Sequence, residues 1–145
     1  GRSYRVFTLL GDGELTEGSN WEASMAAAHY KLDNLVVIVD RNGLQITGPT
    51  EQVMRLESLA DRFKAFGYAL QVCNGNDIAD LIRTFAQLPF EAGKPSLIIA
   101  NTIKGKGISF IENQVNWHHR VPTTDELTCA FEELEEAEAQ LKVSD

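Results

Sequence analysis

The chain has 145 residues, a length that fits one compact domain with a sizeable core. Its formal net charge of −8 and its pI of about 4.8 argue against a nucleic-acid partner, which would require a basic face. No apolar run approaches the length of a membrane span and no signal-peptide pattern opens the chain, so we expect a cytoplasmic protein that is not bound to a membrane.

Four short apolar runs predict β-strands, and the stretches between them predict helices. The runs are continuous rather than alternating, which is typical of strands covered on both faces. They span residues 6–10, 35–39, 69–72 and 97–100. Helices are expected over residues 21–31, 56–66 and 78–88. Because strand and helix alternate, the sequence predicts an α/β fold with a doubly wound, mostly parallel sheet and helices on both faces.

Two segments interrupt this alternation. Residues 40–52 and 102–122 are expected to be long loops, and loops of this length in a compact domain are more often functional than idle. After the second loop, Thr123 and Glu126 offer a capping box for a last helix. We expect one domain over residues 1–145. The apolar stripe of the last helix would consist of Leu127, Phe131, Leu134 and Leu141.

The residues with the clearest chemistry follow the first two strands. Asp12 stands between two glycines after the first strand, and Asn42 follows the second, thirty residues further on. Ligands of open parallel sheets bind outside the carboxyl ends of the strands, so both side chains reach one edge if the two strands are neighbours. A carboxylate and an amide oxygen suit Mg²⁺, and a main-chain carbonyl after Asn42 could supply a third ligand. A bound cation would also explain how an acidic chain holds an anionic cofactor.

Other interpretations of these residues stay open at this point. Gly-Asp-Gly and Asn-Gly are each common in ordinary turns. An aspartate after an apolar strand is also found in receiver-like domains, where it can accept a phosphoryl group. The spacing of Asp12 and Asn42, each closing a strand with one helix between them, favours the cofactor interpretation. The two cysteines, Cys73 and Cys129, form neither a metal-binding spacing nor a disulfide framework, and we expect buried or half-buried free thiols.

The segment from Gly11 to Ala23 resembles transketolase, a thiamine-diphosphate enzyme. Residues 31–35, 40–48 and 104–107 and the pair Trp117-His118 extend the resemblance over nearly the whole chain. It is greatest for transketolases encoded as separate N- and C-terminal subunits. The resemblance implies that Asp12, Asn42 and the carbonyl of Leu44 bind Mg²⁺, or Ca²⁺ or Mn²⁺ in its place. The residues implied to contact thiamine diphosphate are Gly11, Asp12, Gly13, Glu14, Asn42, Leu44, Ile46 and His118.

The same resemblance implies two catalytic residues, Glu17 and His118. Glu17 and Glu22 match an acidic pair that lies at the dimer interface of the family and links its two cofactor sites. A solvated helix start is the alternative for both residues, because negative charge suits that end of the helix dipole. His118 matches a histidine beside the diphosphate and the substrate. The next position is usually glycine in the family, and here it is His119.

The resemblance also implies a partner chain and a reaction. The pyrimidine-binding domain and the upstream part of the diphosphate domain are missing from the sequence, so we expect the partner to be a C-terminal transketolase subunit, within a homo- or hetero-oligomer. An apolar sheet face should be left open for association. The implied reaction moves a two-carbon ketol unit from a ketose phosphate to an aldose phosphate, as in the pentose phosphate pathway. The alternatives are a deoxyxylulose-phosphate synthase, a 2-oxo-acid dehydrogenase or a non-catalytic assembly module.

Overall fold

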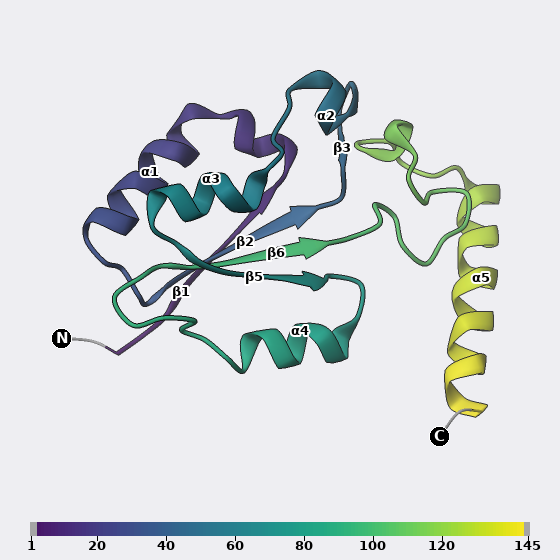
Figure 1. The fold of residues 1–145 in the computed structure, drawn as a ribbon. Coiled ribbons are helices and arrows are strands. Elements are labelled where there is room, and N and C mark those ends of the chain that lie inside the picture. Colours follow the sequence, from purple (N-terminus) through teal and green to yellow (C-terminus); the bar gives the residue numbers. More distant parts are fainter. Residues whose placement is uncertain (1–2, 144–145) are drawn as a thin grey trace. The chain divides into compact units, whose positions relative to one another are not determined.

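The computed structural model describes residues 3–143, which form two compact units with their boundary between Thr102 and Ile103. The first unit contains the parallel sheet and its helices, and the second contains a long loop and one helix (Figure 1). The single domain expected over the whole chain stays a prediction. Within residues 3–143, no helix is both long and apolar enough to span a membrane.

Four parallel strands form the sheet of the first unit, in the order β1-β2-β6-β5. Their bounds are Val6–Gly11 for β1, Leu35–Arg41 for β2, Ala69–Asn74 for β5 and Ser96–Asn101 for β6. All four strands expected from the apolar runs are confirmed. Each continues past its apolar run, because main-chain pairing does not depend on apolar side chains: Gly11 pairs with Asp40, and Arg41 with Asn101.

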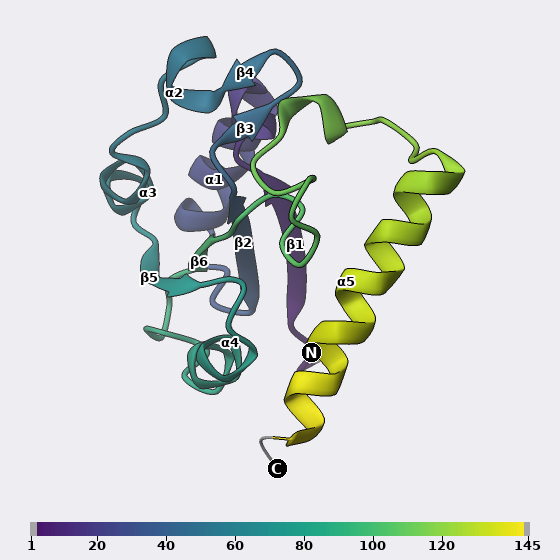
Figure 2. The same ribbon diagram turned by 90° about the vertical axis from the view of Figure 1, so that its right-hand side faces the viewer.

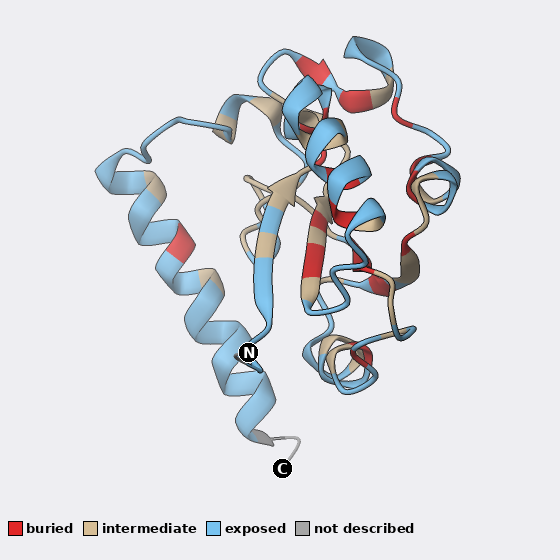
Figure 3. Cartoon of the chain, turned by 90° about the vertical axis from the view of Figure 1, so that its left-hand side faces the viewer, coloured by how far each residue is buried: buried red, intermediate tan, exposed pale blue. Residues whose placement is uncertain are grey.

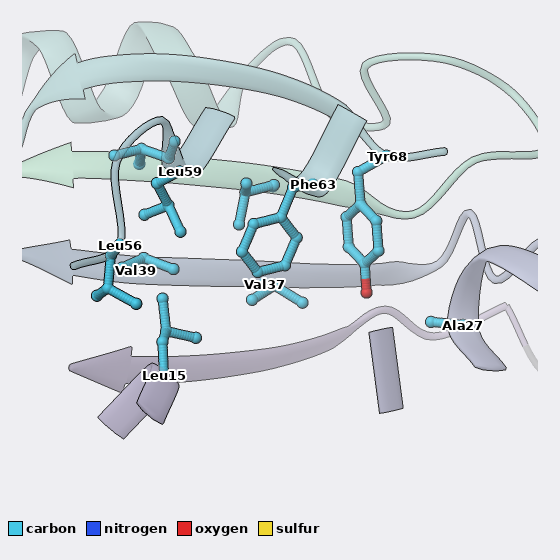
Figure 4. Close-up of a cluster of buried hydrophobic side chains, with 10 residues drawn as sticks. Leu15, Ala27, Val37, Val39, Leu56, Leu59, Phe63 and Tyr68 are labelled. Carbon is cyan, nitrogen blue, oxygen red and sulfur yellow. The ribbon is translucent and has the colours of Figure 1, made fainter. Parts of the chain in front are cut away.

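Helices cover both faces of the sheet, which confirms the expected α/β architecture. Helices α1 (Gly18–His29) and α3 (Leu59–Phe66) lie on one face and α4 (Ile78–Phe85) on the other (Figure 1). Neighbouring strand residues point to opposite faces, so a strand covered twice must be apolar throughout. The core under α1 and α3 comprises Leu15, Ala27, Val37, Val39, Leu56, Leu59, Phe63, Tyr68, Leu97 and Ile99 (Figure 4). The core under α4 comprises Val36, Cys73, Leu88, Ile98 and Ala100.

The helix bounds differ from the expected ones by a few residues. Helix α1 begins three residues early, at Gly18, and ends two residues early, at His29. Helix α3 begins only at Leu59, because the Ser58 hydroxyl caps it by accepting a hydrogen bond from the Asp61 N–H at 3.4 Å. Helix α4 ends at Phe85 rather than residue 88, and the proline at position 89 disfavours helical backbone in the residue before it.

The prediction of one long loop over residues 40–52 is wrong. Its first two residues extend β2, and a short antiparallel hairpin follows, made of β3 (Leu44–Gln45) and β4 (Gly48–Pro49). Helix α2 (Thr50–Val53) completes the segment. Figure 2 shows that the hairpin and α2 follow directly from the end of β2. Strands of two residues are too short for any hydrophobic periodicity to reveal them.

The edge strand β1 is not covered on both faces, contrary to the expectation for all four strands. In register with Val36 and Ile38 of β2, Phe7 and Leu9 point to the α4 face, where 51% and 68% of their surfaces are exposed. Phe7 touches Phe85 of α4, with 6.1 Å between ring centroids. The strand that follows the N-terminus in Figure 3 is accordingly mostly pale blue. Apolar side chains of this edge strand are therefore exposed, as an open sheet face would require.

The second unit consists of a loop with a short 3-10 helix, η2 (Val115–Trp117), and of helix α5 (Thr124–Val143). The capping box is confirmed. The Thr123 N–H donates to the Glu126 carboxylate at 2.8 Å, and the Glu126 N–H donates to the Thr123 hydroxyl at 3.3 Å. The expected apolar stripe of α5 is exposed in this structure. Cys129 is exposed too, so the expectation of a buried or half-buried thiol is wrong there and correct for Cys73.

Candidate functional site

The candidate site lies where β1 and β2 end. The two strands are neighbours, as the site prediction required, and Gly11 is paired with Asp40 at their last shared position. The Asp12 N–H donates to the Asp40 carbonyl at 3.1 Å, so the chain is still held to β2 when it leaves β1. A short 3-10 helix, η1 (Gly13–Thr16), then turns the chain toward α1. Asp12 and Asn42 are therefore delivered to the same edge of the sheet.

Asp12 is the most enclosed polar group of the site, with 0% of its surface exposed. Its Oδ1 accepts a hydrogen bond from the Gly13 N–H at 2.7 Å, and its Oδ2 accepts one from the Gly43 N–H at 2.7 Å. Oδ2 also accepts one from Nη1 of Arg41 at 2.6 Å. A carboxylate has about four lone-pair positions, and three are used here. The remaining position, on Oδ1, takes none of these hydrogen bonds and could serve a cation.

Arg41 connects this carboxylate to two more. Its Nη2 donates to Oε1 of Glu51 at 2.7 Å and to Oε1 of Glu57 at 2.9 Å. Burial works against the charge of the guanidinium, but Asp12 and Glu57 together raise the pKa of Arg41 above its ordinary value. Burial likewise acts to raise the pKa of Glu51, yet the N–H groups of Leu56 and Glu57 and the charge of Arg41 lower it overall.

The sequence interpretation did not assign a role to Arg41. The available signal was a charged residue at the end of a buried strand, between Asp40 and Asn42. The acidic partners Glu51 and Glu57 follow ten and sixteen residues later, a separation at which no helical or strand pattern relates charges to each other.

Asn42 is oriented by hydrogen bonds on both ends of its amide. Its Nδ2 donates to Oδ1 of Asp40 at 3.3 Å, and its Oδ1 accepts from the Leu44 N–H at 3.0 Å. The Thr102 hydroxyl donates a very short hydrogen bond to the same Asp40 oxygen, which ties the end of β6 to this network. The amide oxygen of Asn42 keeps a second lone pair that a cation could use.

The backbone around the site leaves room for a bulky ligand. Gly43 has a φ of +76°, a left-handed conformation that favours glycine, and a Cβ added at Gly43 or Gly11 would meet no atom within 4 Å. At Gly13 a Cβ would lie 2.8 Å from Cβ of Gln45, so the missing side chain lets the hairpin approach. Leu44 is paired with Pro49, which has no N–H, so the Leu44 carbonyl takes no hydrogen bond from that partner.

The oxygen atoms of Asp12, Asn42 and Leu44 are suitable ligands for one hard divalent cation. Within residues 3–143, no three His, Cys, Asp or Glu side chains converge as a metal-binding group. A cation at this edge would instead be held by a carboxylate, an amide oxygen and a main-chain carbonyl, with ligand oxygens and water completing its shell. Mg²⁺ is usually bound in this way, through one or two protein carboxylates and the phosphates of a substrate or cofactor.

The other expected site residues of the first unit are more exposed. Glu14 lies in η1, where its carboxylate accepts a hydrogen bond from the Gly11 N–H at 3.1 Å. Glu17 occupies the N-cap position of α1 but makes no side-chain capping bond, and Glu22 is exposed on the same helix. Ile46 lies in the turn of the β3-β4 hairpin with 62% of its surface exposed, which leaves an apolar side chain open for packing.

His118 belongs to the second unit, where it is exposed and directly follows η2. Its N–H donates to the Val115 carbonyl at 3.0 Å, and its ring centroid lies 6.0 Å from that of His119. The residue before it, Trp117, is held by Arg120, whose guanidinium carbon lies 4.3 Å from the centre of the indole ring. The expected loop over residues 104–107 belongs to this unit and is braced by an ion pair between Lys106 and Glu112 at 3.1 Å.

Comparison with known proteins gives consistent matches. A family model described as "Transketolase, thiamine diphosphate binding domain" matches residues 3–136. An apulose-4-phosphate transketolase subunit of Phocaeicola vulgatus is 50% identical over 133 residues, which cover 92% of this chain and 47% of that protein. The 6-deoxy-6-sulfo-D-fructose transketolase subunit SqwG of a Clostridium strain is 40% identical over 130 residues, which cover 90% and 47%.

Solved structures agree with these relatives. The transketolase of Campylobacter jejuni has a TM-score of 0.74 and 27% sequence identity, over 97% of this chain and 26% of that one. The chain spans about half the length of the two curated relatives described above.

Proposed function

This chain belongs to the transketolase family through its thiamine diphosphate binding domain, and we propose that it is the diphosphate- and metal-holding part of a split transketolase. The observation that carries this proposal is the set of hydrogen bonds that holds Asp12. A fully buried carboxylate is held by two main-chain N–H groups and by Arg41, beside an oriented Asn42 amide. Burying a carboxylate is costly, and a structural turn would not require it.

We propose that Asp12, Asn42 and the Leu44 carbonyl hold Mg²⁺, and that Ca²⁺ or Mn²⁺ can replace it. Gly11, Gly13 and Glu14 would line the diphosphate, and Ile46 would pack against the rings of the cofactor. When bound, thiamine diphosphate supplies the carbanion chemistry that breaks the carbon–carbon bond beside a ketose carbonyl. The chain contributes the anchor: it binds the diphosphate end through the cation and thereby fixes the position of the reactive ring.

Two residues outside this anchor have proposed catalytic roles. Glu17 would belong, with Glu22, to the acidic contact between two cofactor sites. Both glutamates are exposed near the start of α1, and among the described residues of the first unit neither forms an ion pair. His118 would act beside the substrate. Its loop is held by the stacking of Arg120 on Trp117, the residue before the histidine.

The proposed activity transfers a two-carbon ketol unit from a ketose phosphate to an aldose phosphate, within carbohydrate metabolism in the cytoplasm. The partner would be a C-terminal transketolase subunit with the pyrimidine-binding domain, in a homo- or hetero-oligomer. Two relatives support this assignment because their names describe them as transketolase subunits. The exposed Phe7 and Leu9 offer an apolar surface for association.

Cofactor binding tests the proposal directly. Equilibrium dialysis of thiamine diphosphate would be carried out with and without Mg²⁺, on the protein assembled with its partner subunit. We expect binding that requires Mg²⁺ and that Asp12→Asn abolishes, whereas Asp61→Asn, on the exposed side of α3, leaves it unchanged. Binding that survives in Asp12→Asn would overturn the assignment of the site.

The reaction needs a separate assay. Transfer from a ketose phosphate to an aldose phosphate would be measured beside the conversion of pyruvate by the same assembly. We expect activity in the first assay and none in the second. Conversion of pyruvate without ketol transfer would indicate another class of thiamine-diphosphate enzyme, and inactivity in both assays despite cofactor binding would indicate a non-catalytic module.

A further inference from the structure

Arg41 places a fixed positive charge on the carboxylate that the proposed cation must share. Its Nη1 lies 2.6 Å from Oδ2 of Asp12, and only 11% of its side chain is exposed. A charge-assisted hydrogen bond at this distance in a water-poor environment is among the stronger contacts a carboxylate makes. In this structure Arg41 therefore neutralises Asp12 in the way that a metal ion would.

Arg41 is not needed to position Asp12. The two main-chain N–H groups of Gly13 and Gly43 already hold one carboxylate oxygen each, at 2.7 Å. The φ of +76° at Gly43 belongs to the turn that follows β2. Removal of the guanidinium would leave the two main-chain contacts of Asp12 in place and its negative charge uncompensated.

Arg41 also has two other carboxylates within reach. Its Nη2 is 2.7 Å from Glu51 and 2.9 Å from Glu57, and its Nε is 3.3 Å from Glu57. Glu51 is itself held, because its carboxylate accepts hydrogen bonds from the N–H groups of Leu56 at 3.2 Å and Glu57 at 3.4 Å. The guanidinium can thus leave Asp12 and remain paired.

We propose that Arg41 competes with the divalent cation for Asp12 and thereby sets the cation concentration at which the site loads, while Glu51 and Glu57 retain the guanidinium once the cation has displaced it. The inference rests on the proposed function, since it concerns the same cation. Its physical basis is that two positive charges on one buried carboxylate repel each other, and that each weakens the binding of the other. Glu51 and Glu57 shift this balance toward the cation.

The competition predicts that two kinds of substitution change the Mg²⁺ requirement in opposite directions. Arg41→Gln removes the competitor, so half-saturation of thiamine diphosphate binding should require roughly tenfold less free Mg²⁺. The double variant Glu51→Gln with Glu57→Gln removes the alternative partners, so half-saturation should require several-fold more. A residue with a merely structural role would weaken binding in both cases.

The experiment is equilibrium dialysis of thiamine diphosphate at buffered free Mg²⁺ concentrations, with the protein assembled with its partner subunit. Arg83→Gln is the matched control, because Arg83 forms an ordinary surface ion pair with Asp80 on α4 and should leave the Mg²⁺ requirement unchanged. Arg41→Lys keeps the positive charge and should remain near wild type. When Arg41 is already Gln, the two glutamate substitutions should change the requirement by much less than they do alone.

Thermal unfolding provides a second readout that does not depend on activity. In EDTA, Arg41→Gln should unfold at a lower temperature than wild type, because Asp12 loses its counter-charge. Mg²⁺ with thiamine diphosphate should then raise the unfolding temperature of this variant by more than it raises that of wild type. Equal increases in the two proteins would contradict the competition.

The outcomes separate this inference from the proposed function. An unchanged Mg²⁺ requirement in Arg41→Gln overturns the competition. An increased requirement overturns it too and assigns Arg41 to cofactor binding or to folding. If that variant does not fold, the glutamate double variant decides, and a Mg²⁺ requirement equal to that of wild type overturns the inference. A wild-type protein without Mg²⁺-dependent binding would instead overturn the proposed function itself.

Discussion

Replacement of Asp12 by Asn tests the electrostatic design of the site. An amide has the shape of the carboxylate but carries no charge and only one acceptor oxygen. That oxygen is best placed at the position of Oδ2, which serves both Gly43 and Arg41. The NH₂ group then faces the Gly13 N–H, donor against donor. The variant therefore loses one hydrogen bond outright and the ionic part of another.

The expected cost follows from these contacts. A hydrogen bond to a charged group contributes about 1.5–3 kcal/mol, and a buried donor left unsatisfied costs about 1–3 kcal/mol. Loss of one partner of a buried ion pair costs about 3–5 kcal/mol when the other charge is left alone, but Arg41 keeps Glu51 and Glu57. We therefore expect a loss of about 3 kcal/mol, which corresponds to a decrease in Tm of roughly 10 °C for a chain of this size.

Thermal and urea unfolding in EDTA, followed by circular dichroism, would measure this loss without any contribution from bound metal. Asp61→Asn is the control, because its carboxylate is exposed and lies 3.9 Å from Lys64, a separation at which surface pairs contribute little. A double-mutant cycle with Arg41→Gln should show that the two substitutions together cost less than the sum of their separate costs. A loss below about 1 kcal/mol for Asp12→Asn, or strict additivity in the cycle, would refute the argument.

Three further predictions concern single residues. Gly43→Ala should lower the free energy of unfolding by about 1–2 kcal/mol in urea titrations, because its φ is +76°, whereas Gly18→Ala, at an open helix position without positive φ, should not. Cys129 should react with a maleimide at least about tenfold faster than Cys73 in mass-spectrometric time courses, because Cys73 is buried and burial raises the pKa of its thiol. The pKa of Glu126 lies below its ordinary value of 4.5, chiefly because its carboxylate accepts the Thr123 N–H. Its contribution to α5 should therefore be complete above that ordinary value and disappear as pH falls through the lowered pKa, and Glu126→Gln should flatten this part of a pH series of unfolding curves.

Much of the fold could be inferred from the sequence because the relevant signals are local. Each strand covered on both faces must be apolar at successive positions, and β2 and β6 show this in Val36 to Val39 and in Leu97 to Ala100. The capping box at Thr123 and Glu126 predicted the start of α5 for the same reason, since both partners lie within one turn. Asp12 and Asn42 could be placed together once their strands were assumed to be neighbours.

Other features depended on contacts that no local pattern encodes. The two-residue strands of the β3-β4 hairpin are too short for a periodic signal, and the exposure of Leu9 depends on what covers the edge of the sheet rather than on the residue itself. His118 was singled out by resemblance alone, because no local pattern of the sequence sets an exposed loop histidine apart.

The pairing of Arg41 with three carboxylates shows most clearly which features are local and which depend on the tertiary structure. The sequence by itself determined that a carboxylate and an amide each follow the apolar run of a strand, because short-range hydrophobic patterns mark the strands. The structure decided that these two strands are neighbours. Only the tertiary structure decided that Glu51 and Glu57 return to the same guanidinium that neutralises Asp12. The physical reason is that charge interactions depend on distance in space and on burial, and both are set by the tertiary structure rather than by separation along the chain.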